Sequence, residues 1–180
     1  MSQDTERFRS LVERLKSGDE VAFKELYESL SGRVFSYIIP RVGGREEALD
    51  VLQDVFLDLW SARLRFSYVN DASVWGFIFL IARRKLAEHY GKRRRDSEIS
   101  ELPQEDRYDM DINALGDVHA IELGMKELSE KDRDVLTLRY WSGLSFGEIA
   151  EANRKTETAV RVHHHRALAK LETILKNHGN

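Results

Sequence analysis

The residues best suited to chemistry lie near the end of the chain, on a predicted amphipathic helix. Its polar side carries Arg161, His163, His165, Arg166 and Lys170. A helix with its side chains is about 10–12 Å across and fits the DNA major groove, where cations reach phosphates and guanine edges. The pattern predicts DNA binding, and the alternative is a solvent-exposed helix face.

The three successive histidines at 163–165 do not form a metal site. Consecutive helical residues point about 100° apart, and no ligand side chain lies four positions from any of them. His164 falls on the apolar stripe with Val160 and Leu171, so we expect it to be partly buried and hydrogen-bonded. No metal is predicted.

A second cationic segment spans Trp75–Arg95, with seven basic side chains against Glu88. Aromatic residues are interleaved with these charges, and rings can stack on unpaired bases while cations hold the backbone. The alternative is a solvated helix end with most of its rings in the core. These rings are Trp75, Phe77, Phe79 and Tyr90.

Catalysis finds no support in the sequence. The chain has no cysteine, no G-x-S-x-G, no P-loop and no H-E-x-x-H, and the pairs Glu46-Glu47 and Asp19-Glu20 diverge on a helix. No apolar run approaches the roughly 20 residues of a membrane span, and residues 1–9 are polar. We expect a non-enzymatic, cofactor-free, cytoplasmic protein.

These residues must be positioned by helices, because 11 glycines and two prolines in 180 residues are too few for a strand-and-turn fold. Residues 1–95 carry a net charge of +3, residues 96–120 of −7 and residues 121–180 of +1. The acidic segment is poor in large apolar residues, which predicts a linker. The expected fold is all-α, with two small helical domains (1–95 and 121–180) joined by an acidic linker (96–120).

Apolar residues at helical spacing outline the elements of the first domain. Helices are predicted around 8–15, from an N-cap at Asp19 through Leu30, around 34–38, over 46–64 and over 74–90, with Gly18, 40–44 and 66–73 as breaks.

The second domain has clearer punctuation. Ser129 marks a helix start, and Ser145 with Glu148 forms a capping box for a short helix. A turn at 153–155 leads to Thr156, which can cap the long final helix. A short helix, a tight turn and a longer basic helix are typical of a helix-turn-helix.

Two long stretches resemble a known family. Residues 19–60, which include EEALDVLQDVFLDLW, resemble region 2 of the bacterial sigma-70 family, and residues 128–171, which include LSFGEIAEANRKTETAVRVHHHRALAKL, resemble its region 4. The small extracytoplasmic-function (ECF) branch is the most similar. The resemblance covers about four-fifths of the chain and implies a dissociable promoter-recognition subunit of RNA polymerase.

By this resemblance, one helix of region 2 docks on core RNA polymerase through apolar anchors ringed by carboxylates and an amide. The implied residues are Asp50, Leu52, Gln53, Asp54, Phe56, Leu57 and Trp60. The 66–74 loop and the helix after it would hold the melted non-template strand of the −10 element, with a base flipped out of the stack. The implied residues are Phe66, Trp75, Phe77, Arg83, Arg84, Lys92 and Arg93.

Region 4 would read the −35 element as duplex DNA. The residues that the resemblance implies for −35 DNA binding are Lys155, Thr158, Arg161, Val162, His165 and Arg166. The sequence departs from the family motif at Glu157, Thr158, Ala159 and His164, so the contacts at these positions stay open.

The predicted function is therefore a sigma factor that directs promoter-specific initiation, with core RNA polymerase and promoter DNA as its partners and an anti-sigma factor as a further candidate partner. The alternatives are a helix-turn-helix regulator that is not a polymerase subunit and a purely protein-binding module.

Overall fold

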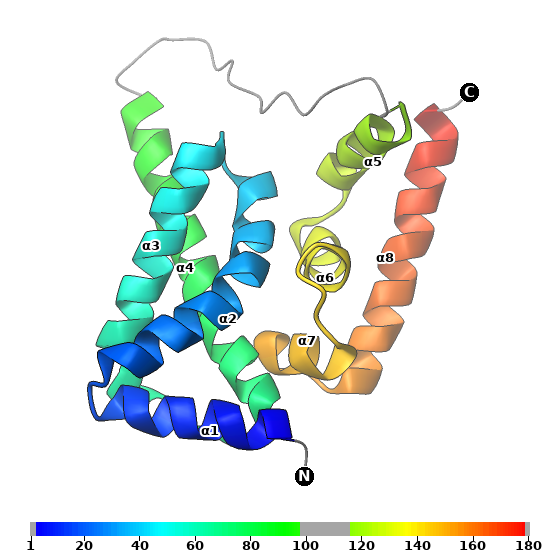
Figure 1. The fold of residues 1–180 in the computed structure, drawn as a ribbon. Helices are drawn as coiled ribbons and strands as arrows, with labels where there is room; N and C mark the ends of the chain where they lie inside the picture. The colour runs from blue at the N-terminus through cyan, green and yellow to red at the C-terminus, as the bar shows by residue number, and fades with distance from the viewer. Residues whose placement is uncertain (1–2, 98–115, 179–180) are drawn as a thin grey trace.

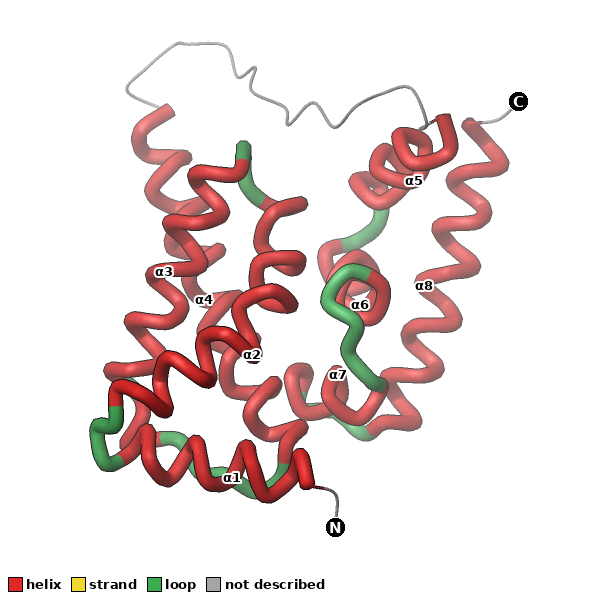
Figure 2. The backbone as a smooth tube through the Cα atoms, viewed as in Figure 1, coloured by secondary structure: helices red, strands yellow, loops and turns green. Residues whose placement is uncertain are grey.

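The computed structural model describes residues 3–97 and 116–178, and the regular structure in these two ranges is entirely helical (Figures 1 and 2). This confirms the all-α prediction. The elements are α1 (Gln3–Lys16), α2 (Glu20–Ile38), η1 (Ile39–Arg41), α3 (Arg45–Ser61), η2 (Arg63–Arg65), α4 (Asp71–Ser97), α5 (Gly116–Glu127), α6 (Glu130–Tyr140), α7 (Phe146–Asn153) and α8 (Glu157–His178). No helix in the described ranges combines the length and the apolar character that a membrane crossing requires.

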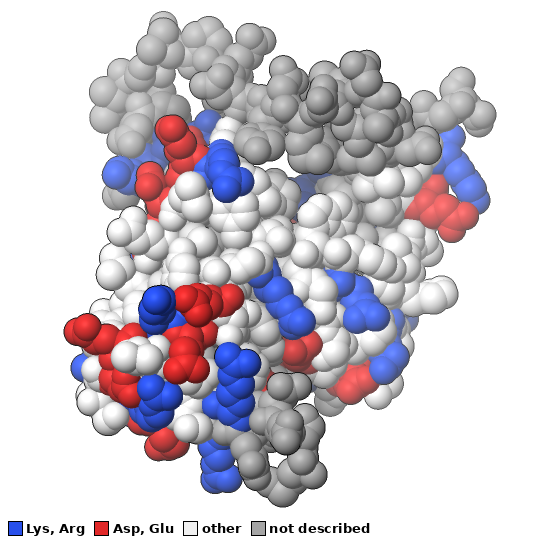
Figure 3. All heavy atoms as spheres, viewed as in Figure 1, with Lys and Arg blue, Asp and Glu red and all other residues white. Residues whose placement is uncertain are grey.

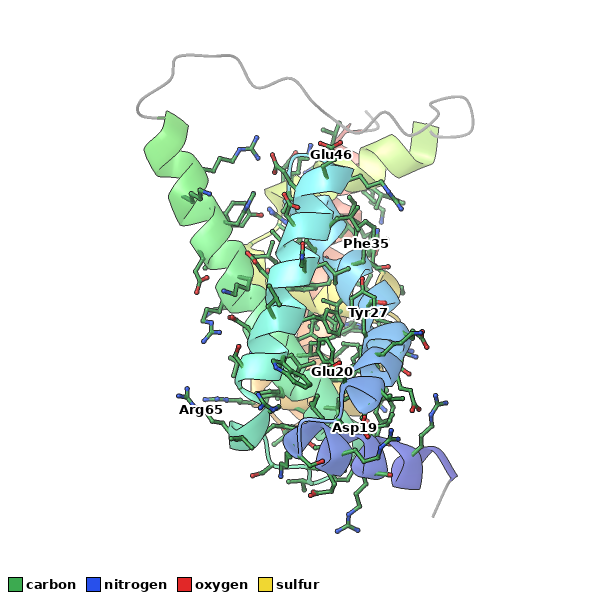
Figure 4. All side chains as sticks on the ribbon, turned by 60° about the vertical axis from the view of Figure 1, so that its left-hand side comes forward. Asp19, Glu20, Tyr27, Phe35, Glu46 and Arg65 are labelled. Atoms are coloured by element: carbon green, nitrogen blue, oxygen red, sulfur yellow. The ribbon has the colours of Figure 1, made fainter. Side chains whose placement is uncertain are left out.

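Helices α1 to α4 form an amino-terminal bundle around residues that recur every three or four positions. Leu26, Leu30 and Val34 are the buried side of α2. Asp19 caps this helix, as predicted, because its Oδ1 accepts hydrogen bonds from the backbone N–H groups of Val21 and Ala22 at 2.8 and 3.1 Å. Figure 4 shows the bundle from the side, with Asp19 at the start of α2.

Helices α5 to α8 form the second bundle, in which hydrogen bonds at the helix ends fix the turns. The predicted capping box is present, since Ser145 accepts from the backbone of Glu148 and Glu148 accepts from the backbone of Ser145. Arg154 ends α7 in the left-handed conformation with φ of 53°. Thr156 then accepts from the Ala159 N–H at 3.2 Å and opens α8. The predicted helix-turn-helix is therefore confirmed.

Several boundaries differ from those predicted from the sequence. The stretches around 20–30 and 34–38 form one continuous helix, α2. The predicted helix 46–64 ends at Ser61, and η2 follows it. Helix α4 begins at Asp71, three residues before the predicted 74–90 helix, and it continues to Ser97.

Helix α5 lies partly inside the segment predicted as a linker, since it begins at Gly116. Its packing on α8 explains this, because a Cβ placed on Gly124 would lie 2.9 Å from Cδ1 of Leu171. Helices α5 and α8 therefore touch through the bare backbone of a glycine, a contact that no local pattern indicates. The rest of the predicted linker, residues 98–115, lies outside the described residues.

The two bundles pack against each other along α4 and α7 (Figure 1). At Gly76 the backbones come so close that an added Cβ would lie 3.1 Å from the carbonyl carbon and 3.2 Å from the carbonyl oxygen of Glu151. A larger side chain does not fit between the two helices. Arg33 of α2 also reaches Glu148 of α7 at 3.7 Å.

A polar cluster joins the bundles beside this contact. Asp134 of α6 accepts hydrogen bonds from the Tyr37 hydroxyl and from Nη2 of Arg83 at 2.9 Å, and Arg41 lies 3.6 Å away. Arg83 also donates to the carbonyl oxygen of Ala152 at 2.7 Å. Burial and, after it, the Asp134 charge raise the pKa of Tyr37, so this phenol stays protonated and donates. We call these four side chains, Tyr37, Arg41, Arg83 and Asp134, the Asp134 cluster.

Candidate functional site

Helix α8 and the turn before it expose the side chains that the sequence predicted to contact duplex DNA. All six are exposed to solvent: Lys155, Thr158, Arg161, Val162, His165 and Arg166. Four of them line one shallow groove at the amino-terminal end of the helix, together with Lys131, Thr156, Ala159 and His163. Arg161 and His165 lie outside the lining of this groove.

Lys131 is a groove residue that sequence reasoning missed. It belongs to the first turn of α6 and reaches the groove only because α6 and α8 pack together. Lys131, Lys155 and Arg166 give the groove a basic lining, which attracts phosphate. The positive end of the α8 dipole adds to this attraction.

A buried carboxylate fixes α8 on α6. Asp132 is 4% exposed and accepts hydrogen bonds from Nε2 of His163 at 2.9 Å, Nζ of Lys170 at 2.6 Å and the Ser129 hydroxyl at 2.7 Å. Burial alone would raise the pKa of Asp132, but these hydrogen bonds outweigh it and lower the pKa to about 2. His163 and Lys170 are therefore held by α6, and they set the orientation of α8 in the bundle.

His164 occupies the apolar side of α8, as predicted, but without the expected hydrogen bond. Its ring lies between those of Tyr140 and Phe146, with centroids 5.6 and 5.1 Å away. Within the described residues its buried Nε2 has no hydrogen-bond partner. Burial, followed by the charges of Arg139 and His165, lowers the pKa of His164, so the neutral ring is favoured.

The helix α3 divides the seven residues predicted to bind the polymerase into two groups. Asp50, Gln53, Asp54 and Leu57 are exposed, and Trp60 is half-buried. Leu52 and Phe56 are 3% and 2% exposed and belong to the core, so in this arrangement their side chains do not face a partner. The Phe56 ring instead packs on Tyr27, with centroids 4.6 Å apart.

Aromatic side chains lie beside the exposed group. Trp60 packs edge-on against Phe23 at 5.2 Å, and Tyr27 is 39% exposed. Acidic and basic side chains gather in Figure 3 where α1, α2 and the end of α3 meet. Figure 4 shows this side of the bundle, with Tyr27 on α2 and Arg65 beyond the end of α3.

The seven residues predicted for unpaired DNA are not brought together on one surface. The rings of Phe66 and Phe77 stack with centroids 4.7 Å apart, and Phe66 and Trp75 are buried. Arg83 belongs to the Asp134 cluster between the bundles. Arg84 is exposed but paired with Asp58.

The last two residues of this set are at the far end of α4. Lys92 is exposed, whereas Arg93 is half-buried and lies 3.6 Å from Glu47. Exposed apolar side chains also lie before α4 and in its first half, and the sequence argument missed them. They are Leu64 and Val69 of the segment before α4, which are 71% and 77% exposed, and Leu80 of α4 itself.

Comparisons with known proteins identify both bundles. The family model described as Sigma-70 region 2 matches residues 26–96, and the one described as Sigma-70, region 4 matches residues 119–171. The solved structure of the sigma factor RpoE with the anti-sigma factor NepR from Bartonella quintana has a TM-score of 0.64 at 20% identity. The match covers 86% of this chain and 96% of that one, which shows a shared fold.

Curated relatives extend over nearly the whole chain. The ECF RNA polymerase sigma factor SigD of Mycobacterium tuberculosis (strain ATCC 25618 / H37Rv) is 33% identical over 184 residues, covering 96% of this chain and 85% of SigD. The ECF RNA polymerase sigma factor BldN of Streptomyces coelicolor is 29% identical, covering 96% of this chain and 67% of BldN. With both regions matched in order, this chain belongs to the ECF branch of the sigma-70 family.

Proposed function

We propose that this protein is a sigma factor that binds core RNA polymerase and directs initiation at promoters through −35 duplex DNA and the melted −10 strand. The basic groove at the start of α8 carries this proposal. It combines a helix that fits the major groove, exposed cations along its first turns and a rigid attachment to α6 through Asp132. The chain itself performs no chemical step in this function.

The groove would hold the DNA backbone while α8 reads bases. Lys131, Lys155 and Arg166 are suited to phosphates, which fix the register of the protein on the duplex. Arg161 lies outside the groove lining on the exposed side of α8, where a guanidinium can reach a guanine edge.

Core polymerase would bind on the exposed face of α3. Leu57 and Trp60 supply apolar contact area, and Asp50, Gln53 and Asp54 surround it with groups suited to a basic partner. Leu52 and Phe56 support this face from the core and do not take part in direct contacts.

The unpaired −10 strand would bind near the segment before α4. Exposed Leu64 and Val69 offer apolar surface, and the stacked pair of Phe66 and Phe77 supports it from below. Arg83 is not free for this strand in the packed arrangement, because it donates to Asp134 and to the Ala152 carbonyl oxygen.

Promoter binding therefore requires the two bundles to separate. Elements centred 25 base pairs apart lie about 85 Å apart in straight B-DNA. A compact chain of this length has a radius of gyration of about 16 Å, so it spans about 40 Å. We propose that the free protein has the two bundles packed together through the Asp134 cluster. An anti-sigma factor would act by keeping the bundles from binding polymerase and DNA.

The proposal is tested by transcription from a genomic fragment library with purified core polymerase. The protein is expected to direct transcripts from defined start points that core polymerase alone does not use. A helix-turn-helix regulator would bind duplex fragments without changing these start points, and a protein-binding module would show no salt-sensitive DNA binding. Either result would contradict the proposed function.

A further inference from the structure

The first turn of α8 carries an acidic side chain on a surface that is otherwise basic. Glu157 is exposed, and it lies one helical turn before Arg161 on the same side of α8. The neighbouring groove is lined by Lys131, Lys155 and Arg166. A carboxylate in this place repels phosphates, so it weakens general DNA affinity.

Glu157 is held in a defined position by both helices of the helix-turn-helix. Its Oε1 accepts hydrogen bonds from Nε and Nη2 of Arg161 at 3.0 and 2.6 Å. The Arg161 guanidinium lies 4.5 Å from the centre of the Phe146 ring of α7. A Cβ placed on Gly147 would lie 3.6 Å from Oε2 of Glu157, an ordinary van der Waals distance, so this oxygen lies beside the first turn of α7.

The pair keeps one acceptor and one donor group unused. Within the described residues, Oε2 of Glu157 accepts no hydrogen bond, and Nη1 of Arg161 donates none. The guanidinium has five N–H donors in a rigid fork, so two bonds to Glu157 leave three N–H groups. An exposed acceptor and an exposed donor therefore lie side by side in the first turns of the helix.

This combination matches the major-groove edge of a C·G pair. Cytosine presents its N4 amino group, which Glu accepts from, and guanine presents O6 and N7, which Arg donates to. Thymine presents an acceptor at the corresponding place, where it would repel the carboxylate. The carboxylate thus favours one base pair at the same time as it weakens general affinity.

We propose that Glu157 is a specificity-determining residue that accepts a hydrogen bond from the N4 amino group of a cytosine in the −35 element. Arg161 donates to a guanine of the same or the adjacent base pair. This inference rests on the proposed function and names the sequence class that the surface of α8 selects.

The test is selection from a duplex promoter library randomised over the −35 element, bound by core polymerase with the full-length protein. The wild-type protein is expected to select cytosine at one position. In Glu157→Ala the ratio of cytosine to the other bases at this position should fall about 5- to 150-fold, which corresponds to the discrimination that one base contact provides. Glu157→Gln should shift the preference to adenine, whose N6 and N7 match an amide.

Glu172→Gln is the matched control, because Glu172 is also an exposed acid of α8 paired at i,i+4, here with Lys176 at 2.6 Å. It lies in the second half of the helix, away from the groove residues. This variant should keep the wild-type base preference at every position.

Two results would overturn the inference. If Glu157→Ala keeps the wild-type preference and only binds more tightly at low salt, the carboxylate acts by repulsion alone. If Glu157→Gln, whose amide oxygen can still accept a hydrogen bond from Arg161, keeps the wild-type preference for cytosine, Glu157 is a positioning residue for Arg161. A wild-type protein without any selection at the −35 element would contradict the proposed function itself, so the wild-type profile tells the two failures apart.

Discussion

The contact between the two bundles depends on Asp134, and its removal should open the molecule. The Asp134→Ala variant leaves the Tyr37 hydroxyl without its acceptor and removes the charged partner of Arg83 in a largely buried place. Arg83 keeps two neutral acceptors, the Ala152 carbonyl oxygen and Oδ1 of Asn153. Breaking a buried ion pair by removing one partner costs about 3–5 kcal/mol. We take about 3 kcal/mol, because Arg83 is hydrated again when the bundles part. The ratio of packed to separated molecules should then fall roughly a hundredfold.

The separation is measurable as a distance. The chain has no cysteine, so Ser29→Cys and Thr173→Cys, both exposed and in different bundles, accept spin labels at known places. Double electron–electron resonance should give one short distance for the parent protein and a broad, longer distribution after Asp134→Ala. Asp54→Ala is the matched control, because this exposed acid of α3 lies outside the contact.

A second variant distinguishes a loss of the contact between the bundles from a loss of stability within one bundle. Gly76→Ala should favour the α4 helix itself by about 0.5–1 kcal/mol. It nevertheless places a Cβ 3.1 Å from the Glu151 backbone and so pushes α7 away. Both variants should lengthen the distance while circular dichroism shows unchanged helix content. An unchanged short distance in both variants would refute the reasoning that the Asp134 cluster and the Gly76 contact hold the bundles together.

Three further predictions concern the bundles themselves. Because the pKa of Asp132 is lowered to about 2, the carboxylate stabilises the fold above its unfolded-state pKa near 3.8, and this stability is lost as the pH falls towards 2. In urea unfolding, Asp132→Asn should be about 2 kcal/mol less stable than the parent at neutral pH and equal to it near pH 2. Leu57→Ala should weaken binding to core polymerase about tenfold with unchanged stability, whereas Phe56→Ala should lower the free energy of unfolding by about 3–5 kcal/mol, because Leu57 is exposed and Phe56 is buried. Equal effects of the two variants on stability would contradict this difference in burial. Lys131→Ala and Arg166→Ala should each reduce the salt dependence of DNA binding by about one unit of slope while keeping base preference, and a changed preference would show that they contact bases.

Much of the fold follows from local patterns. Asp19, Ser145 and Thr156 act as caps where the sequence predicted them, because a cap satisfies N–H groups only two or three residues away. The apolar stripes of α2 and α8 likewise follow from spacing alone. The helix-turn-helix and the basic face of α8 were therefore predictable without a structure.

The composition of the sites was less predictable, because it depends on contacts between distant residues. Leu52, Phe56 and Leu57 have similar hydrophobicity, yet only Leu57 is exposed, since α2 and α4 cover the other sides of α3. Lys131 enters the groove of α8 only through the packing of α6. The stripe of a single helix does not tell which apolar residue remains uncovered.

Most of the helices, their caps, the division of charge and the two family regions follow from the order of the residues, because helical spacing and capping depend on neighbours within a few positions of the chain. The tertiary structure was needed to show that Arg83 pairs with Asp134 across 51 positions, that α4 meets α7 at a bare glycine, and that Asp132 anchors α8. These are pairings between side chains on different helices. Their partners are chosen by the packing of whole elements, which no local periodicity specifies.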